Sequence, residues 1–457
     1  MATMEYKVSL PIYRDVDVAV VGAGPAGIGA AIAAARNRAK VFVFDQWGSV
    51  GGMATMGLVG PFMTSFDSSG NNQIIRGIFE ELVQRMKAMG GAIHPKDIGP
   101  ECSYSGYYKI GHNHVGPFDH EPFKIAATEM LRESGAELLL HTRFVDVLME
   151  KERIAGLVIS NKAGISAVKA KVVIDCSGDG DVAVRSGAGF DLGRKDDGNI
   201  QAATMFFRVC NVDTEKMDAH MAEHKQEIKP FFGPYSWLIR EKSAEWEGIH
   251  RGEVCLFQNP TKGEFRMNVT RILDVDGTKP EDLTRAEIEG TKQAVQAFTF
   301  LKKYARGFEN ALFMGTAATI GIRESRHIHG KYWLTGEEVE NCRVPDTSIA
   351  VFATNLDTHN KNDVQGTFIT IQKGPFYGVP YGCLVPEKTD NLLVAGRPIS
   401  AEAAAASSTR MMPCCIALGQ AAGTAAAMAV QNKQRPADVD VQKLRDTLKT
   451  QGAYFGE

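Results

Sequence analysis

The sequence predicts an α/β fold, in which a parallel sheet assembled from separate stretches of chain carries an inserted α+β region. Three observations predict it. An apolar run at residues 17–21 leads directly into the glycine-rich turn Gly22-Ala-Gly-Pro-Ala-Gly27. Two later apolar runs, 169–175 and 391–395, also end in turns of small residues. The sequence pattern of residues 196–370, which lie between these runs, is different. Continuous apolar runs of this length are typical of strands buried on both faces of a parallel sheet.

Residues 17–45 predict one strand–helix–strand unit. The strand 17–21 is followed by a helix over 27–39 that consists mostly of alanine and glycine, and then by a second strand at 41–44 that ends in Asp45. Small side chains allow such a helix to lie close against the sheet.

The remaining elements follow from apolar spacing and from capping residues. Apolar positions at helical spacing predict a helix over 77–89, whereas 90–120 is irregular and is expected to form a long functional loop. Further helices are predicted over 122–134, over 284–304 from a capping box at Thr284 and Glu287, and over 412–430; strands are predicted at 137–141, 144–149, 154–161 and 204–209.

Composition excludes several classes of protein. The 51 basic residues are balanced by 54 acidic residues, so the chain lacks the positive surplus needed for extensive contact with nucleic acid. No run of roughly 18 apolar residues predicts membrane insertion, and the first residues do not resemble a signal peptide. The eight cysteines are scattered without a CxxC pair, which favours a reducing cytoplasm.

The glycine turn predicts a dinucleotide site. Gly22 permits a tight turn, Gly24 permits close approach of a pyrophosphate, and Gly27 permits close packing of helix on strand. The start of the following helix offers free N–H groups and the positive end of its dipole. Asp45, 21 residues beyond Gly24, stands where a carboxylate is expected to bind ribose hydroxyls.

Two further features favour FAD over NAD, because the longer cofactor needs additional contacts. The strand before Ser177 runs into a turn of glycine and aspartate, in which Asp181 is expected to accept a hydrogen bond from the ribityl chain. The segment Gly396-Arg397, with the start of the 412–430 helix, is expected to lie at the flavin. The predicted FAD-binding residues are Gly22, Gly24, Pro25, Ala26, Gly27, Asp45, Gln46, Gly51, Gly52, Val145, Ser177, Gly178, Asp181, Gly396, Arg397, Gly419 and Ala422.

Motifs along nearly the whole chain resemble a known family. They include VAVVGAGPAGIGAAIAAA, GGMATMGLVGPFM, VVIDCSGDGDVAVRSGAGFDLG, GIRESRHIHGKY and NLLVAGRPIS. Together they resemble the broad bacterial family of FAD-dependent oxidoreductases, some of whose members carry the label xanthan lyase. The resemblance implies a glutathione-reductase-like Rossmann FAD domain that is discontinuous, formed by 1–66, 121–195 and 371–457. An inserted substrate or cap domain would comprise 67–120 and 196–370.

The resemblance also bears on catalysis. The family commonly carries a histidine at the position of His359, which is therefore the first candidate for a proton-transferring group, although a structural role in a loop competes with it. Where the family has a histidine after its AGR motif, this chain has Ala403. The other candidates for this proton-transferring group are His112, His114, His120, His327 and His329.

Three further kinds of side chain are candidates for the site. Arg323 and Arg326 would bind a substrate carboxylate or brace the flavin, or else form structural ion pairs with Glu324 or Glu338. Tyr381, with Tyr377, would wall the flavin pocket or pack in the core. Cys414 and Cys415 would be redox-active or simply packed, and no metal site is expected.

The predicted function is that of an FAD-dependent dehydrogenase or reductase that transfers hydride between a small polar organic substrate and flavin N5. Because a second GxGxxG is absent, a separate electron acceptor or donor is expected, and a homo-oligomer is left open. The alternatives are a flavin monooxygenase or halogenase, and a sensor protein in which FAD has no catalytic role.

Overall fold

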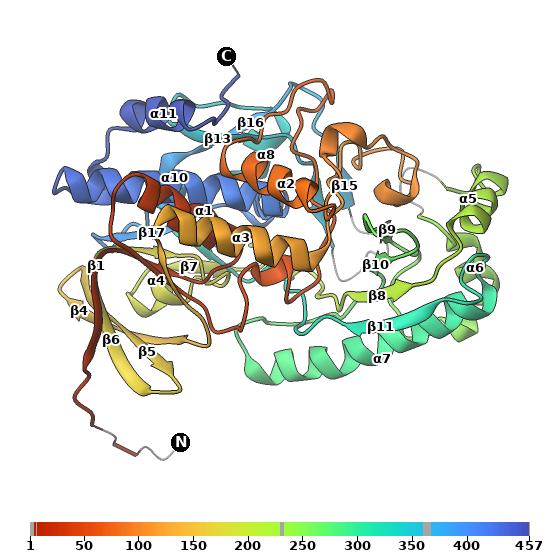
Figure 1. Ribbon diagram of the computed structural model, residues 1–457, viewed down its shortest axis with the longest axis horizontal. Helices are drawn as coiled ribbons and strands as arrows, with labels where there is room; N and C mark the ends of the chain where they lie inside the picture. Colours follow the sequence, from red (N-terminus) through yellow and green to blue (C-terminus); the bar gives the residue numbers. More distant parts are fainter. Residues whose placement is uncertain (1–3, 6, 229–232, 360–366, 457) are drawn as a thin grey trace.

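The computed structural model describes residues 4, 5, 7–228, 233–359 and 367–456, and within them it has two main sheets of different kind and three sheets of two strands each (Figure 1). The larger sheet lies on the side of the N-terminal strand, and the smaller one lies beside the long helix α7, Pro280–Tyr304.

The larger sheet has seven strands in the order β3-β2-β1-β6-β5-β4, with β17 also paired to β6. The pairs among β3, β2, β1, β6 and β17 are parallel, whereas β5 and β4 continue the sheet in antiparallel fashion. The strands are β1 Ile12–Val21, β2 Val41–Phe44, β3 Glu137–Leu139, β4 Arg143–Glu150, β5 Arg153–Asn161, β6 Gly164–Asp175 and β17 Leu392–Val394. Each of the strands predicted in these regions is thereby confirmed.

Helices pack in the core of this sheet, some of them against its strands and the others against those helices. They are α1 Pro25–Arg36, α2 Ile78–Ala88, α3 His120–Ser134, α10 Met412–Gln431 and α11 Val441–Thr450. Helix α10 lies directly against α1 (Figure 1). A Cβ atom at Gly419 would stand 2.0 Å from the Ala26 carbonyl oxygen, so the small residues of both helices are required by their close approach.

Helix α10 is long and apolar enough to cross a membrane, but 83% of its apolar window is buried inside the protein. Its composition is therefore explained by its position in the core, where it packs against α1 and against the sheet.

The smaller sheet is antiparallel, with the order β11-β8-β10-β9, and it has its own apolar core. Its elements are β8 Phe207–Cys210, α5 Thr214–Glu223, α6 Ser236–Glu241, β9 Leu256–Gln258, β10 Phe265–Met267, α7 Pro280–Tyr304 and β11 Leu312–Thr316. Helix α7 begins four residues before the predicted start. Pro280 occupies its first turn, and the Thr284 hydroxyl donates to the Pro280 carbonyl instead of capping the helix.

Packing differs from the predicted domain boundaries in two places. Helix α2, from the stretch 67–120, packs in the core of the larger sheet, and so does the pair β13 Ser348–Phe352 and β16 Tyr377–Pro380. Helix α2 and strand β13 were expected in the inserted region, whereas β16 lies in the segment 371–457 that was predicted for the FAD domain. The sequences of α2 and β13 do not show which core they join. The remaining short elements are α4 Asp181–Arg185, β7 Phe190–Leu192, β12 Arg326–Ile328, α8 Gly336–Glu340, β14 Leu356–Thr358, β15 Thr367–Ile369 and α9 Ala403–Thr409.

Candidate active site

A cavity of about 1110 Å³ begins at the carboxyl ends of the parallel strands. The residue that follows each of β1, β2, β6 and β17 lines it, namely Gly22, Asp45, Cys176 and Ala395. This edge is where open parallel sheets bind their ligands. The opposite wall comes from the smaller sheet and its loops, which contribute Phe206, Phe257 and Asn268.

Glycine is needed at the three glycine positions of the turn for different physical reasons. Gly22 has φ +94°, and a Cβ there would lie 2.4 Å from the Cys176 carbonyl oxygen; a Cβ at Gly27 would lie 1.8 Å from the Gly22 carbonyl oxygen. Both positions are therefore fixed by the fold. At Gly24 the nearest atom to such a Cβ is 3.9 Å away, and the residue faces the cavity. The protein itself leaves room at Gly24, as expected where a ligand's phosphates approach the backbone.

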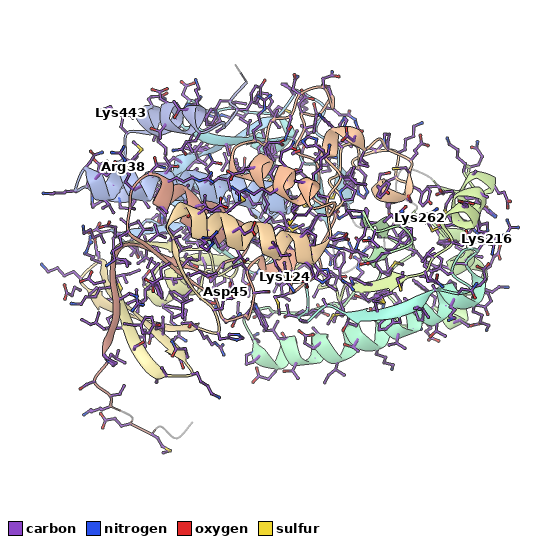
Figure 2. All side chains as sticks on the ribbon, viewed as in Figure 1. Arg38, Asp45, Lys124, Lys216, Lys262 and Lys443 are labelled. Carbon is purple, nitrogen blue, oxygen red and sulfur yellow. The ribbon has the colours of Figure 1, made fainter. Side chains whose placement is uncertain are left out.

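Asp45, which is labelled in Figure 2, is buried and contacts this turn. Its Oδ2 accepts a hydrogen bond from Ala23 N at 2.6 Å and its Oδ1 accepts one from Trp47 N at 2.9 Å, while burial raises the pKa of its carboxyl group. The carboxylate thus holds the shape of the turn. A carboxylate can accept about four hydrogen bonds, so acceptor capacity remains for the ribose contact predicted at this position.

Most of the predicted cofactor residues line the cavity. These are Gly22, Gly24, Pro25, Ala26, Asp45, Gln46, Gly52, Val145, Ser177, Gly178, Asp181, Gly396 and Arg397. The glycine turn with an open Cβ position at Gly24, the α1 N-terminus and the size of the cavity fit FAD.

Four predicted cofactor residues lie outside the cavity lining. Gly27 packs against Gly22, and Gly51 donates its N–H to the Ala23 carbonyl at 2.8 Å. Gly419 and Ala422 belong to the part of α10 that is buried against α1, so their assignment to the cofactor is wrong. The part of α10 that does face the cavity is its first turn, with Met412 and Cys415.

Two arginine–aspartate pairs stabilise the turn after β6. Arg326 Nη1 lies 2.8 Å from Asp181 Oδ1, and Arg397 Nη2 lies 2.8 Å from Asp179 Oδ1. The predicted ion-pair partners of Arg326, Glu324 and Glu338, are therefore wrong. The true partner of Arg326 could not be identified from the sequence, because spacing along the chain does not show that β12 lies beside this turn.

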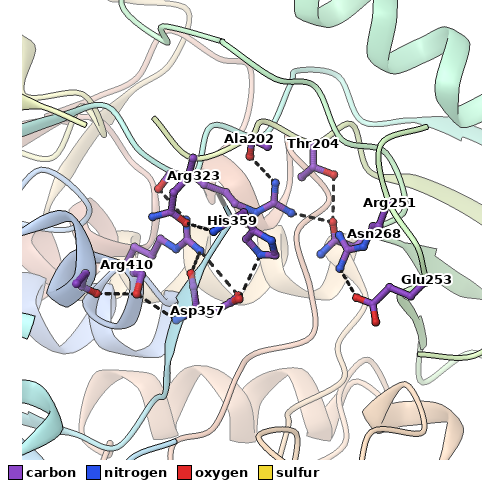
Figure 3. Close-up of polar contacts among 12 residues, drawn as sticks. Ala202, Thr204, Arg251, Glu253, Asn268, Arg323, Asp357, His359 and Arg410 are labelled. Carbon is purple, nitrogen blue, oxygen red and sulfur yellow. Dashed lines mark hydrogen bonds and ion pairs between the residues drawn. The ribbon is translucent and has the colours of Figure 1, made fainter. Parts of the chain in front are cut away.

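At the other end of the cavity the structure brings together His359, Asp357, Arg410 and Arg323 (Figure 3). His359 Nε2 lies 3.3 Å from Asp357 Oδ1, and Arg410 Nη2 lies 3.0 Å from the Asp357 carbonyl oxygen and 3.9 Å from its Oδ2. Arg410 also donates from Nη1 to the Arg323 carbonyl at 3.1 Å. His359 and Arg323, predicted separately, thus lie in one polar cluster.

Burial sets the protonation of this cluster. It lowers the pKa of His359 to about 4, although Asp357 acts in the opposite direction, so the imidazole is neutral at pH 7. Burial alone would raise the pKa of Asp357, but His359, Arg410 and Arg323 hold it well below its usual value. Burial, with the charges of Arg410 and Arg251, lowers the pKa of Arg323 to about 9.

Several residues at this end were not predicted. Arg251 and Glu253 form a buried ion pair at 2.9 Å, and Asn268 Oδ1 accepts hydrogen bonds from Thr204 Oγ1 and Arg323 Nη2 (Figure 3). Tyr108 also lines the cavity. Each residue comes from a loop next to the smaller sheet, and no spacing rule connects these loops.

Tyr381 does not line the cavity, so its predicted place at the site is wrong. Its buried hydroxyl donates to the Pro436 carbonyl at 2.8 Å, and the Tyr377 hydroxyl lies 2.6 Å from Ser408 Oγ. Both rings pack in the core of the larger sheet. Ala403, which replaces the histidine of the family pattern, is also buried and lies outside the cavity lining.

Among the other candidate histidines, only His112 lines the cavity in the described part of the chain. His327 pairs with Glu324 at 2.9 Å, His329 pairs with Asp191 at 2.9 Å, and the His114 ring stacks on Phe66. His120 contacts Arg208 Nη1 at 2.9 Å. These contacts give each of them a structural role.

Cys414 and Cys415 lie at the start of α10, and burial raises the pKa of both thiols. Protonated thiols are poor nucleophiles, so packing explains this pair better than redox chemistry. Within residues 4, 5, 7–228, 233–359 and 367–456, no three His, Cys, Asp or Glu residues are grouped to hold a metal ion.

Comparison with known protein families yields a match that spans nearly the whole chain. The sequence model of the FAD dependent oxidoreductase family matches residues 17–448. Shorter matches are to the thiamine thiazole synthase of Aeropyrum pernix, 33% identical over 32% of this chain and 43% of that protein, and to the small chain of glutamate synthase [NADPH] of Halomonas elongata, 46% identical over 10% of each. This chain therefore matches less than half the length of either relative.

Among solved structures, a geranylgeranyl bacteriochlorophyll reductase-like protein from Thermoplasma acidophilum is 14% identical, with 96% of this chain and 84% of that chain covered and a TM-score of 0.49. The anhydrotetracycline hydroxylase OxyS from Streptomyces rimosus is 13% identical, with 95% and 65% covered and a TM-score of 0.44. The family match extends over both sheets and over every strand end that forms the cavity. The chain belongs to the family of FAD-dependent oxidoreductases, and it is an enzyme with FAD as its cofactor.

Proposed function

We propose that the enzyme is a dehydrogenase or reductase that transfers hydride between a small polar organic substrate and flavin N5, and that it exchanges electrons with a separate partner. One observation carries this proposal: a single cavity leads from the glycine turn to the buried cluster of His359, Asp357 and Arg323. FAD supplies the hydride chemistry, and the protein has to supply binding, orientation and a path for the proton.

His359 is our candidate for the proton-transferring group. A neutral imidazole accepts the proton that accompanies oxidation of a C–H or N–H bond, and the pKa of about 4 keeps it neutral at pH 7. Asp357, at 3.3 Å from Nε2, would orient the ring and stabilise the imidazolium that forms.

The proposal also includes the type of FAD domain and the cellular location of the enzyme. The larger sheet would be a glutathione-reductase-like FAD domain built from discontinuous segments, and the smaller sheet with α7 would form the substrate or cap domain. All eight cysteines are free, which supports a cytoplasmic location.

The test is anaerobic reduction of the FAD-loaded enzyme by a panel of sugar derivatives, hydroxy acids and unsaturated acids, followed by flavin absorbance near 450 nm. Bleaching by one metabolite without NAD(P)H is the expected result for a dehydrogenase; reoxidation by one of the compounds after chemical reduction is expected for a reductase. Bleaching by NAD(P)H alone, followed by peroxide or a hydroxylated product, would assign a monooxygenase, and a flavin inert in every arm would assign a sensor.

His359→Ala separates a catalytic from a structural role. The variant should retain FAD, because the contacts of His359 in the described part of the chain are with Asp357, Ala202 and Gln201 and not with the glycine turn. Its rate of flavin reduction should fall by about 100-fold or more. The matched control is His329→Ala, whose ring is exposed and paired with Asp191 outside the cavity. An unchanged rate in His359→Ala would return the residue to a structural role.

A further inference from the structure

Arg323 presents a cation to the cavity without a carboxylate of its own. Its Nη1 donates to the Ala202 carbonyl at 2.6 Å and its Nη2 donates to Asn268 Oδ1 at 3.1 Å, both uncharged acceptors. Among the described residues, no carboxylate lies within ion-pair distance of its guanidinium. A guanidinium carries five N–H donors in a planar fork, so part of that fork remains for a ligand.

The neighbouring charges do not compensate Arg323. Those that act most strongly on it are Arg410, Arg251, Arg271 and one carboxylate, Asp357. Asp357 is already engaged by His359 and Arg410, and the nearby Glu253 is engaged by Arg251.

The other acidic residues close to this end are engaged elsewhere. The Glu324 carboxylate accepts from His327 Nε2 and from Gln201 N, and it lies outside the cavity lining. Of the other arginines that line the cavity, Arg326 and Arg397 each have an aspartate partner, and Arg143 and Arg185 are exposed to solvent. Of the three arginines that line the cavity beside His359, namely Arg251, Arg323 and Arg410, Arg323 alone thus has no carboxylate partner among the described residues.

We infer that this end of the cavity binds the carboxylate of an organic acid, with Arg323 as its anchor and with the rest of the substrate next to His359. The inference rests on the proposed function, because it names the class of substrate for that same site. Arg323 would bind two carboxylate oxygens through its fork. The lowered pKa of Arg323 is consistent with this, since positive neighbours destabilise the guanidinium cation and an anionic ligand would relieve that effect.

A carboxylate suits the site better than a phosphate group does. One uncompensated charge matches a monoanion, whereas a phosphate ester carries nearly two negative charges at pH 7 and usually draws on several cations or on the N-terminus of a helix. Arg251 and Arg410 cannot supply that second cation without giving up Glu253 and Asp357.

The test measures binding to the oxidised, FAD-loaded enzyme, so that no turnover is needed. The probes are lactate and fumarate, their uncharged amides lactamide and fumaramide, and inorganic phosphate. Saturable changes in the flavin absorption spectrum and isothermal titration calorimetry report binding. The expected result is that at least one carboxylate binds about tenfold or more tightly than its amide and than phosphate. Equal affinity for acid and amide, or preference for phosphate, would overturn the inference.

Three variants test the anchor. Arg323→Met should weaken carboxylate binding about tenfold or more, Arg323→Lys should restore part of it, and Glu253→Gln should strengthen it, because removing a negative charge raises the local positive potential. General damage to the site would weaken binding in all three. Arg306→Met is the matched control, since Arg306 is exposed and paired with Glu223 outside the cavity lining. Thermal unfolding of each variant verifies that it is folded.

The outcomes keep this inference apart from the proposed function. Carboxylate binding that depends on Arg323, without flavin reduction or reoxidation by any organic compound, would support the anion site and reject the hydride-transfer proposal. Flavin reduction by an uncharged metabolite, with no carboxylate bound, would support hydride transfer and reject the anion site.

Discussion

Gly24 shows how one residue can separate cofactor binding from folding. A methyl group at this position meets no protein atom closer than 3.9 Å, whereas at Gly27 it would collide with the chain. Gly24→Ala should therefore fold normally and lose FAD affinity by about tenfold or more, which is a binding free energy of about 1.4 kcal/mol. FAD content after purification and titration of the apoprotein measure it.

The matched control for this prediction is Gly99→Ala, because Gly99 also has open space around its Cβ position but does not line the cavity. It should retain FAD. A fully loaded Gly24→Ala enzyme would contradict the assignment of this turn to the pyrophosphate.

His359 should make the stability of the protein depend on pH. The pKa of His359 is about 4 in the folded protein and about 6.5 in an unfolded chain. As the pH falls below about 6.5 the unfolded state takes up the proton first, so the folded state loses stability until about pH 4. In His359→Asn this loss disappears, and between pH 7 and 5 the variant should lose about 1–2 kcal/mol less free energy of unfolding than the wild type.

Urea unfolding at pH 7, 6 and 5 measures this difference. The pKa of His112 and that of His120 are also lowered, but both residues are present in the two proteins and their effects cancel. Equal losses in wild type and variant would show that His359 does not titrate as its burial implies.

At the scale of elements, the contact between α1 and α10 opposes helix propensity. Alanine is favoured over glycine in a helix by about 1 kcal/mol, so propensity alone predicts that Gly419→Ala stabilises the protein. The added methyl group would lie 2.0 Å from the Ala26 carbonyl oxygen, and overpacking of this kind costs about 1–3 kcal/mol. We expect a net loss of stability, measured as a lower midpoint of thermal unfolding, and a gain would refute the close packing.

Elements with a local sequence pattern were predicted correctly, whereas the role of the small residues of α10 was not. The strands of the larger sheet and the tight turn at Gly22 have local patterns, and the structure confirms both; the contact of Gly24 with pyrophosphate stays a prediction. Gly419 and Ala422 were assigned to the cofactor because small residues permit close approach to a ligand and to a helix alike, and the sequence does not distinguish the two.

The far end of the cavity was less predictable, for a different reason. His359 and Arg323 were identified one at a time, but Arg410, Arg251 and Asn268 join them only through contacts between distant loops. Tyr381 illustrates the opposite error, because its position just before β17 placed it near the site in sequence while its hydroxyl is directed at Pro436.

At the scale of the whole molecule, both sheets contribute walls to one cavity, so FAD should stabilise the entire fold. A ligand that binds the native state alone stabilises it by about 2.7 kcal/mol at a concentration 100 times its dissociation constant. We expect the midpoint of thermal unfolding of the apoprotein to rise with FAD concentration. In Gly24→Ala the rise should require higher concentrations, and a midpoint independent of FAD in the wild type would contradict binding in this cavity.

The contacts of Arg410 and Arg323 affect when the substrate end of the cavity can form during synthesis of the chain. The hydrogen bonds that tie the substrate end together, from Arg410 to the carbonyls of Asp357 and Arg323 and from Arg323 to that of Ala202, span 53, 87 and 121 residues of sequence. Contacts of such separation close long loops and form late in folding. The glycine turn therefore emerges from the ribosome well before Arg410 does, and the newly made enzyme gains its substrate site only after nearly the whole chain has been synthesised.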